Sequence, residues 1–334
     1  MKTLLLHRLR VAARALALLT LAATSLVAGA QPADAAWPSR PIRVVIPYGA
    51  GSSPDVFARL VGDQLQQRLG QPIVVENRVG AGGNVGTGLV AKAPGDGYTF
   101  LVSTNGPLVY NTILYRKLAY DPFTELRPVV LGGGQANVCA VRADSGIASL
   151  SGLVDAMRAE PGKFNYSSIG VGSLSHLGVE LLKTRARTFA VHIPYPSSPA
   201  AILSILQGDV HFACVPAIAV IPQVKAGKLR ALAVSTGKRS ALMPDIPTMK
   251  EAGLPDVENL AWMAFMAPAS TPTAIVERMN REINAVLAMP EVRAKMHAQY
   301  MEPIGGSTDE LRRFMLKERE VMAPVIRRSG ATVD

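Results

Sequence analysis

Apolar residues follow strand-like and helix-like patterns in alternation along most of the chain. Residues 41–47 form a short β-branched and apolar run typical of a buried strand, and apolar residues from 56 to 65 then recur at helical spacing. Further strands are expected at 72–76, 99–103, 138–141, 164–167, 191–194, 229–234 and near 264–267, with helices between them. This alternation predicts an α/β fold with parallel sheets covered by helices.

The length of the chain, 334 residues, is too great for one simple core, so two domains are expected. Three consecutive glycines at 132–134 mark the expected crossing between them. The C-terminal part is helical in pattern, includes a capping box from Ser307 to Glu310, and is expected to return to the first domain. The expected division is 37–134 plus 260–334 for lobe 1 and 135–259 for lobe 2.

Residues 1–30 carry the pattern of a secretory signal peptide. The start of this segment is basic, with Lys2, Arg8, Arg10 and Arg14. An apolar stretch follows, and Ala28-Gly29-Ala30 fits a small-residue cleavage site. No cysteine follows that could carry a lipid, and no later segment reaches the ~18 uninterrupted apolar residues of a membrane span. We therefore expect a soluble, exported protein without a lipid anchor.

The charge of the chain excludes one class of partner. Without the four basic residues of the leader, the formal net charge of +10 becomes +6. The remaining basic residues form no run longer than a pair, and few aromatic residues lie near them. This distribution is typical of a solvated surface, so nucleic acid is not expected as a partner.

The two cysteines, Cys139 and Cys214, both lie in apolar, strand-like runs. An oxidising compartment would permit a disulfide between them. Buried free thiols also behave as small hydrophobic side chains, and this second interpretation is favoured by the apolar surroundings. The pattern leaves both states open.

Two glycine-rich loops, at 49–51 and 80–86, suggest nucleotide binding but lack its fingerprint. Neither loop reads G-x-G-x-x-G, and no G-x-x-x-x-G-K-[ST] motif occurs. The five histidines are scattered without metal-binding spacing. We therefore expect neither a cofactor nor a metal.

Small and polar loops follow several expected strands, at 48–53, 103–106, 170–175 and 195–198. In the first loop Ser53 fits a helix N-cap and Pro54 the first helical position, so backbone N–H groups would face an anion. From the local pattern alone, a plain strand–helix connection is the favoured interpretation of this segment. Because ligands of open α/β sheets lie beyond the carboxyl ends of the strands, the four loops together predict a cleft for a small carboxylate between two hinged domains.

A hydrolase is the alternative from another functional class. Ser173, Ser175 and His176 could supply a nucleophile and a base, but no G-x-S-x-G elbow surrounds the serines. A serine and a histidine this close on one helix start seldom reach catalytic geometry. Loss of ester turnover in Ser173→Ala would favour the enzyme, whereas weaker ligand binding without turnover would favour a receptor. We expect no enzymatic activity.

An ordered set of motifs runs through the chain from residue 37 to the last helices. The set comprises Trp37-Pro-Ser-Arg-Pro-Ile-Arg-Val-Val-Ile-Pro-Tyr48, Val75-Glu-Asn-Arg78, Gly80-Ala-Gly-Gly-Asn84, Pro94-Gly-Asp-Gly-Tyr-Thr99, Tyr120-Asp-Pro122, Ser173-Leu-Ser-His-Leu177, Lys225-Ala-Gly-Lys-Leu-Arg-Ala-Leu-Ala233 and Pro244-Asp-Ile-Pro-Thr248. Together these motifs resemble the substrate-binding proteins of tripartite tricarboxylate transporters, also called the Bug family.

The resemblance implies a periplasmic receptor of the two-lobed, type II periplasmic-binding-protein fold, with the ligand cleft between the lobes. Such a receptor is expected to be a monomer and to hand a small carboxylate to a membrane permease of one large and one small subunit. The ligand-binding positions it implies are Tyr48, Gly49, Ala50, Gly51, Ser52, Ser103, Thr104, Gly172, Ser173, Ser175, His176 and Tyr195. A sensing receptor without a permease remains a further alternative.

The chain departs from the family pattern at several cleft positions. Ser52 stands where a second glycine is usual, and Tyr195-Pro-Ser197 replaces Tyr-Lys-Gly. Val210-His211 replaces Val-Asp, and Val215-Pro216 stands where the family often has Asp-Asn. The distal half of the pocket is therefore expected to be altered, and an amino acid is less supported as ligand than a plain carboxylic acid. A dicarboxylate, an aromatic acid and other acids all stay open.

Overall fold

The strands of the protein form two sheets in a computed structural model that describes residues 37–329. The predicted signal peptide at 1–30 lies outside the described residues. The first sheet has the strand order β11-β4-β10-β3-β1-β2, and the second has the order β7-β6-β8-β5-β9. Both belong to the compact unit of the chain that begins at Arg40. We call the parts built on them the first and the second lobe.

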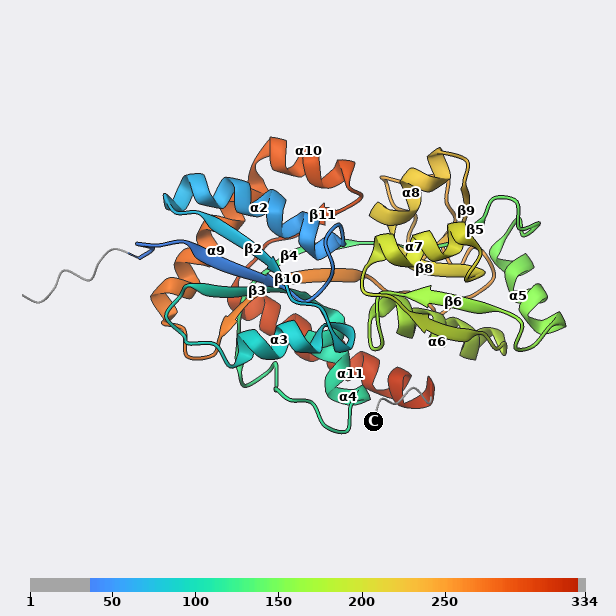
Figure 1. Ribbon diagram of the computed structural model, residues 1–334, viewed down its shortest axis with the longest axis horizontal. Helices are drawn as coiled ribbons and strands as arrows, with labels where there is room; N and C mark the ends of the chain where they lie inside the picture. The colour runs from blue at the N-terminus through green and yellow to red at the C-terminus, as the bar shows by residue number, and fades with distance from the viewer. Residues whose placement is uncertain (1–36, 330–334) are drawn as a thin grey trace, which may run out of the picture. The chain divides into compact units, whose positions relative to one another are not determined.

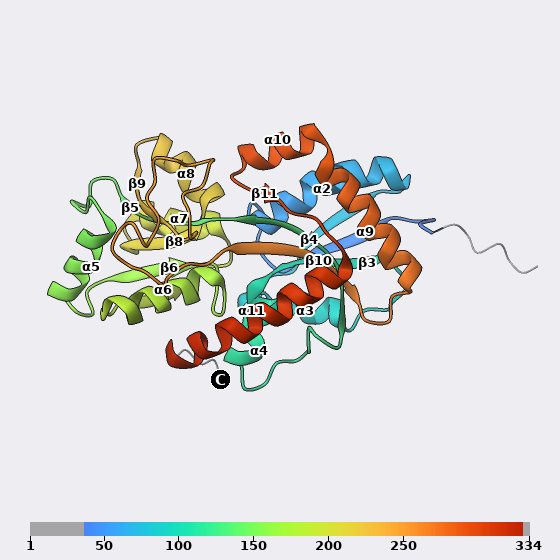
Figure 2. The same cartoon turned by 180° about the vertical axis from the view of Figure 1, so that it is seen from behind.

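The first lobe takes residues from both ends of the described chain. Its strands are β1 (Ile42–Ile46), β2 (Ile73–Asn77), β3 (Thr99–Thr104), β4 (Leu126–Gln135), β10 (Ala261–Pro268) and β11 (Glu302–Pro303). Its helices are α2 (Ser53–Leu69), α3 (Asn84–Ala91), α4 (Asn111–Leu114), α9 (Thr273–Ala288), α10 (Pro290–Ala298) and α11 (Thr308–Ser329), with short turns η1 (Ala81–Gly83) and η2 (Gly106–Tyr110). In Figures 1 and 2, α2 and α9 cover one face of the sheet and α3 and α11 the other.

The second lobe is continuous in sequence. Its strands are β5 (Asn137–Arg142), β6 (Asn165–Ser168), β7 (Val191–Pro194), β8 (Phe212–Pro216) and β9 (Leu229–Val234). Its helices are α5 (Leu150–Ala159), α6 (Leu174–Ala186), α7 (Ser198–Gln207) and α8 (Ala217–Lys225). Figure 1 shows α7 and α8 on one face of this sheet, with α6 on the other.

The predicted parallel pairing holds for only part of each sheet. β1 pairs in parallel with β2 and β3, and β6 pairs in parallel with β7 and β8. The remaining pairs are antiparallel: β10 with β3 and β4, β11 with β4, and β5 with β8 and β9. The fold is therefore a mixed α/β architecture, because the strands next to the interlobe crossings enter the sheets in the opposite direction.

The chain crosses between the sheets at two places. The first crossing lies between β4, which ends at Gln135, and β5, which begins at Asn137, and the return leads from β9 into β10 at Ala261. The three glycines predicted to form the crossing lie instead inside β4. A Cβ on Gly132 would stand 2.2 Å from the ring of Phe57, so the close approach of α2 requires glycine there. The predicted boundaries at 134/135 and 259/260 remain a proposal.

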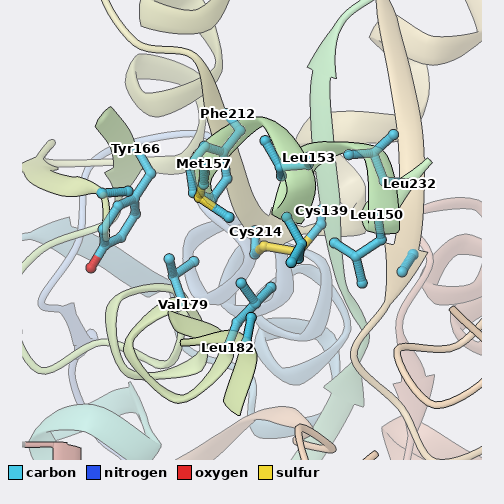
Figure 3. Packing of buried hydrophobic residues seen from close by; sticks show 14 of the residues in the cluster. Cys139, Leu150, Leu153, Met157, Tyr166, Val179, Leu182, Phe212, Cys214 and Leu232 are labelled. Carbon is cyan, nitrogen blue, oxygen red and sulfur yellow. A yellow bond between two sulfur atoms is a disulfide. The ribbon is translucent and has the colours of Figure 1, made fainter. Parts of the chain in front are cut away.

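A disulfide joins Cys139 and Cys214, and these are the only two cysteines of the chain. The two residues face each other directly in the antiparallel pair β5–β8. Figure 3 shows their sulfur atoms among buried apolar side chains that include Leu150, Leu153 and Leu182. The favoured interpretation as buried free thiols is wrong, although the expected apolar surroundings are present. The opposed register brings the sulfur atoms together, and the sequence pattern did not reveal that register.

Helix α11 packs against both lobes and brings a carboxylate to the crossing. Glu318 accepts a hydrogen bond from Trp262 Nε1 at 2.8 Å and another from the hydroxyl of Tyr110. Asn105 in turn donates from Nδ2 to the Tyr110 hydroxyl and to the Leu260 carbonyl, at 3.1 and 3.2 Å. Burial raises the pKa of Glu318. This network fixes β10 and the segment after β3 to the C-terminal helix.

Replacement of Glu318 by leucine is expected to lower the free energy of unfolding by about 2 kcal/mol, because the buried Trp262 N–H and Tyr110 hydroxyl would lose their acceptor. Denaturation in urea measures this difference. Glu320→Leu on the exposed side of the same helix is the control, and about 0.5 kcal/mol or less is expected there. Equal losses in the two variants would show that the network adds nothing to stability.

Candidate functional site

The loop between β1 and α2 satisfies most of its hydrogen bonds internally. Ser52, and not the predicted Ser53, is the N-cap of α2, and its side chain makes no cap bond. The Ser52 hydroxyl donates instead to the Gly49 carbonyl at 2.6 Å. The N–H of Gly51 donates to Asp55 Oδ2 at 2.9 Å, so a side chain of the helix already occupies that anion-binding donor.

The loops of the two lobes touch at glycine positions. The N–H of Gly49 in the first lobe donates to the carbonyl of Pro196 in the second at 3.2 Å. Gly82 has a φ of 62°, and a Cβ there would stand 2.0 Å from the Val171 carbonyl oxygen. These contacts leave no room for larger residues, so the glycines allow the lobe surfaces to meet.

The hydroxyl groups at the start of α6 form hydrogen bonds to backbone groups of the same segment. Ser173 caps α6 by accepting a hydrogen bond from the His176 N–H at 3.3 Å, and it donates to the Gly170 carbonyl at 2.6 Å. Ser175 Oγ accepts from the Ile169 N–H at 3.1 Å. The ring of His176 accepts at Nδ1 from the Gly172 N–H at 3.2 Å and is not bonded to either serine in the described structure. The serine–histidine pair of the hydrolase alternative is therefore not joined by a hydrogen bond between a serine hydroxyl and the imidazole ring.

His176 belongs to a buried aromatic column in the second lobe. Its ring stacks on His192 with 4.1 Å between ring centroids, and His192 stacks on Tyr166 at 5.0 Å. His192 Nε2 lies 2.6 Å from the Ser168 hydroxyl. Burial lowers the pKa of His176 to about 4 and that of His192 to about 3. Both rings are therefore neutral at pH 7 and supply no positive charge for an anion.

A small cavity of about 20 Å³ lies beside the interlobe crossings, and we call it the inner chamber. It is lined by Ser53, Pro54, Thr104, Asn105, Gln135, Asn137, Ile169, Leu174, Ser175, Ser198, Pro216, Ala261, Trp262 and Met263. Four buried polar atoms on its wall have no hydrogen-bond partner among the described residues: Ser53 Oγ, Gln135 Oε1, Asn137 Oδ1 and Ser198 Oγ. Since buried polar groups are rarely left unpaired, this wall is suited to a polar ligand that forms hydrogen bonds with these atoms.

Equivalent sequences in the two lobes position two of these hydroxyl groups. Ser53 is the first residue of α2, within Ser52-Ser53-Pro54, and Ser198 is the first residue of α7, within Ser197-Ser198-Pro199. Both helix N-termini therefore present a serine to the inner chamber. Ser198 lies in the predicted polar loop at 195–198 but was not among the predicted ligand-binding positions, although the repeated Ser-Ser-Pro at two helix starts was a visible signal.

A larger cavity of about 540 Å³ adjoins the inner chamber, and we call it the outer chamber. It is lined by Pro47, Tyr48, Val79, Gly80, Ala81, Gly82, Gly83, Tyr115, Ile169, Gly170, Val171, Pro194, Tyr195 and Pro196. Ile169 lines both chambers, and the Tyr48 hydroxyl of the outer chamber is 2.8 Å from Thr104 Oγ1 of the inner one. Desolvation raises the pKa of Tyr48, so this hydroxyl stays protonated.

The structure brings only some of the predicted site residues to these chambers. Thr104 and Ser175 line the inner chamber, and Tyr48 and Tyr195 line the outer one. The others line neither chamber: Gly49, Ala50, Gly51, Ser52, Ser103, Gly172, Ser173 and His176. Ser103 is buried with its hydroxyl 3.3 Å from Thr87 Oγ1. Which of these residues contact a ligand remains a prediction.

Residues 37–329 contain neither a candidate metal site nor a candidate membrane span. Within residues 37–329, no group of three or more His, Cys, Asp or Glu side chains is placed to hold a metal ion. The helices of the same described part are too short or too polar for any of them to span a bilayer.

Comparison with known proteins gives concordant matches along the chain. A family model described as "Tripartite tricarboxylate transporter family receptor" matches residues 57–331. A UPF0065 protein from the tcbD-tcbE intergenic region of Pseudomonas sp. (strain P51) is 37% identical over 308 residues, covering 92% of this chain and 91% of that protein. Protein BugT of Bordetella pertussis is 36% identical over 310 residues, covering 92% and 95%.

Solved structures with the same fold include ligand complexes. R. palustris Rpa4515 with adipate has a TM-score of 0.86 and 34% identity, covering 88% of this chain and 98% of that one. The periplasmic binding protein BugD has a TM-score of 0.84 and 28% identity, covering 89% and 99%. MatC from Rhodopseudomonas palustris with bound malate has a TM-score of 0.83 and 28% identity, covering 87% and 100%. The fold is thus that of periplasmic solute-binding proteins.

Proposed function

The chain belongs to the tripartite tricarboxylate transporter receptor family, and we propose that it is a periplasmic receptor that binds a small carboxylate without transforming it. The ligand is held in the chambers between the two lobes. Relatives of the same fold are described with adipate and with malate, which supports a carboxylate as ligand. The receptor then delivers the ligand to a membrane permease.

The observation that carries the proposal is the set of four unpaired polar atoms in the inner chamber. The hydroxyls of Ser53 and Ser198 can donate to a carboxylate, and each stands at the positive end of a helix dipole. The side-chain amides of Gln135 and Asn137 can each turn the NH₂ group toward the same carboxylate. A carboxylate in this place would satisfy groups that otherwise bear a desolvation cost.

The location and the partner are proposed on separate grounds. The disulfide between Cys139 and Cys214 suits an oxidising compartment, as the predicted signal peptide at 1–30 does. The partner implied by the family is a permease with a large and a small membrane subunit, and the receptor itself is proposed to act as a monomer. A receptor that serves only for sensing would bind the same ligand in the same place.

The geometry at α6 disfavours the hydrolase alternative. The Ser173 hydroxyl donates to the Gly170 carbonyl, and His176 Nδ1 accepts from the Gly172 N–H, so these hydrogen bonds do not link the serine hydroxyl to the imidazole ring as a nucleophile and its base. Hydrolysis of an ester substrate that disappears in Ser173→Ala would overturn this conclusion.

The first test is a thermal-shift panel of carboxylic acids on protein that has been denatured and refolded to remove bound ligand. A ligand that binds only the folded state adds about 2.7 kcal/mol at a hundredfold excess over its dissociation constant, which gives a readily measured rise in melting temperature. Absence of a shift with every acid would contradict the proposed function.

Ser53→Ala and Ser198→Ala are each expected to weaken binding of the best acid about tenfold or more, because a hydrogen bond to a charged group contributes roughly 1.5–3 kcal/mol. Isothermal titration calorimetry measures the dissociation constants. Ser204→Ala is the control, since Ser204 lies in the same helix as Ser198, is buried, and donates to the Ala201 carbonyl away from both chambers. Unchanged affinity in both chamber variants would remove the inner chamber from the site.

A further inference from the structure

The outer chamber carries no ionic group. None of its lining residues is an aspartate, glutamate, lysine, arginine or histidine. The charged residues next in sequence are engaged elsewhere: Arg78, beside Val79, pairs with Glu76, and Arg116, beside Tyr115, lines a separate groove on the α11 side. A second carboxylate placed in this chamber would therefore meet no cation.

The backbone donors of the outer chamber are also partly engaged. The Gly83 N–H donates to the Gly80 carbonyl at 2.9 Å, and the Gly170 N–H donates to Ser168 Oγ at 3.1 Å. The hydroxyl groups of Tyr48 and Tyr115 bond to Thr104 and to the Ala81 carbonyl. An anion in the chamber would lose water without receiving a full set of hydrogen bonds in return, which is costly.

The wall that remains is apolar and comes from both lobes. Val79 and Tyr115 from the first lobe face the same space as Val171, Tyr195 and Pro196 from the second. The volume of about 540 Å³ lies within the range of small-molecule sites. Such a wall stabilises an aliphatic or aromatic group by removing apolar surface from water.

The geometry points to a monocarboxylate with an apolar aliphatic or aromatic body as the ligand, with its carboxylate in the inner chamber and its body in the outer one. This inference rests on the proposed function and narrows its substrate class. The chain then differs in preference from relatives described with adipate or malate, which carry a carboxylate at each end. The selectivity arises because a second charge would be desolvated without a partner, whereas a methyl group or ring would be favourably buried.

Two matched pairs of acids test the inference by calorimetry on ligand-stripped protein. Hexanoate and adipate have the same chain length and differ at one end, and 4-methylbenzoate and terephthalate differ in the same way around a ring. In at least one pair the monoacid is expected to bind tenfold or more tightly than its diacid. If any dicarboxylate binds as tightly as the best monocarboxylate, the inference is overturned while the proposed function stands. If no acid binds, both fail.

A charge added to the outer chamber should reverse the preference. Pro196→Lys keeps the backbone carbonyl that accepts from Gly49 and adds an ammonium group at the chamber wall. The ratio of diacid to monoacid affinity is expected to rise tenfold or more. Pro199→Lys is the matched control, because Pro199 is nearby but lines neither chamber. An unchanged ratio in Pro196→Lys would contradict the placement of the ligand body in the outer chamber.

Discussion

Removal of the Cys139–Cys214 disulfide is expected to lower the free energy of unfolding by about 4 kcal/mol. The bond joins residues 75 positions apart, so it restricts a large part of the unfolded chain. Both cysteines are buried in the core of the second lobe, beside Leu150 and Leu153. Paired replacement by alanine would keep that core apolar, and the loss would come chiefly from the greater entropy of the unfolded state.

Denaturation curves of the Cys139→Ala/Cys214→Ala protein against the wild type give the difference. A thiol reductant provides the control, since it should destabilise the wild type and leave the double variant unchanged. Neither cysteine lines the inner or the outer chamber, so ligand affinity of the folded double variant should stay close to that of the wild type. Equal stability of the two proteins would contradict the expected contribution of the bond.

The alternation of strands and helices was predictable because it rests on local hydrophobic patterns. The run at 41–47 and the helical spacing after it correspond to β1 and α2. The direction of pairing was not predictable in this way. β4 and β10 pair antiparallel although they are far apart in sequence, and only the path of the chain between the lobes decides that orientation. The same reasoning applies to the disulfide, which depends on the register of β5 against β8.

The sequence predicted the loops around the chambers better than the residues that line them. A shift of one position separates the predicted helix cap at Ser53 from the observed cap at Ser52, and this shift decides which hydroxyl faces the inner chamber. Gln135 and Asn137 belong to no motif, and their importance follows from the place where the chain crosses between the sheets. Internal bonds such as those of Ser173 likewise depend on the folded loop.

Acidification from pH 6.5 to pH 4.5 is expected to lower the free energy of unfolding by an amount on the order of 4 kcal/mol, through His176 and His192. Burial lowers the pKa of His176 to about 4 and that of His192 to about 3, below the value near 6.5 that each ring has when unfolded. In this interval the unfolded chain binds protons that the folded chain does not bind, so stability falls as the pH falls. Glu180 raises the pKa of His176, whereas Lys183 lowers both pKa values, so the column as a whole disfavours the charged rings.

A variant without the two histidines separates this effect from that of the carboxylates, because both proteins keep the same carboxylates. Asp55, for example, has a pKa lowered from 3.8, so the loss of its charge contributes only at more acidic pH. Between pH 6.5 and 4.5, the melting temperature should therefore fall more steeply with decreasing pH in the wild type than in His176→Gln/His192→Gln. Glutamine can still accept from the Gly172 N–H and bond to Ser168, so the variant removes the titration and keeps the hydrogen-bonding groups. Parallel slopes would show that the folded and the unfolded protein take up protons on these two rings equally, which would contradict the lowered pKa values.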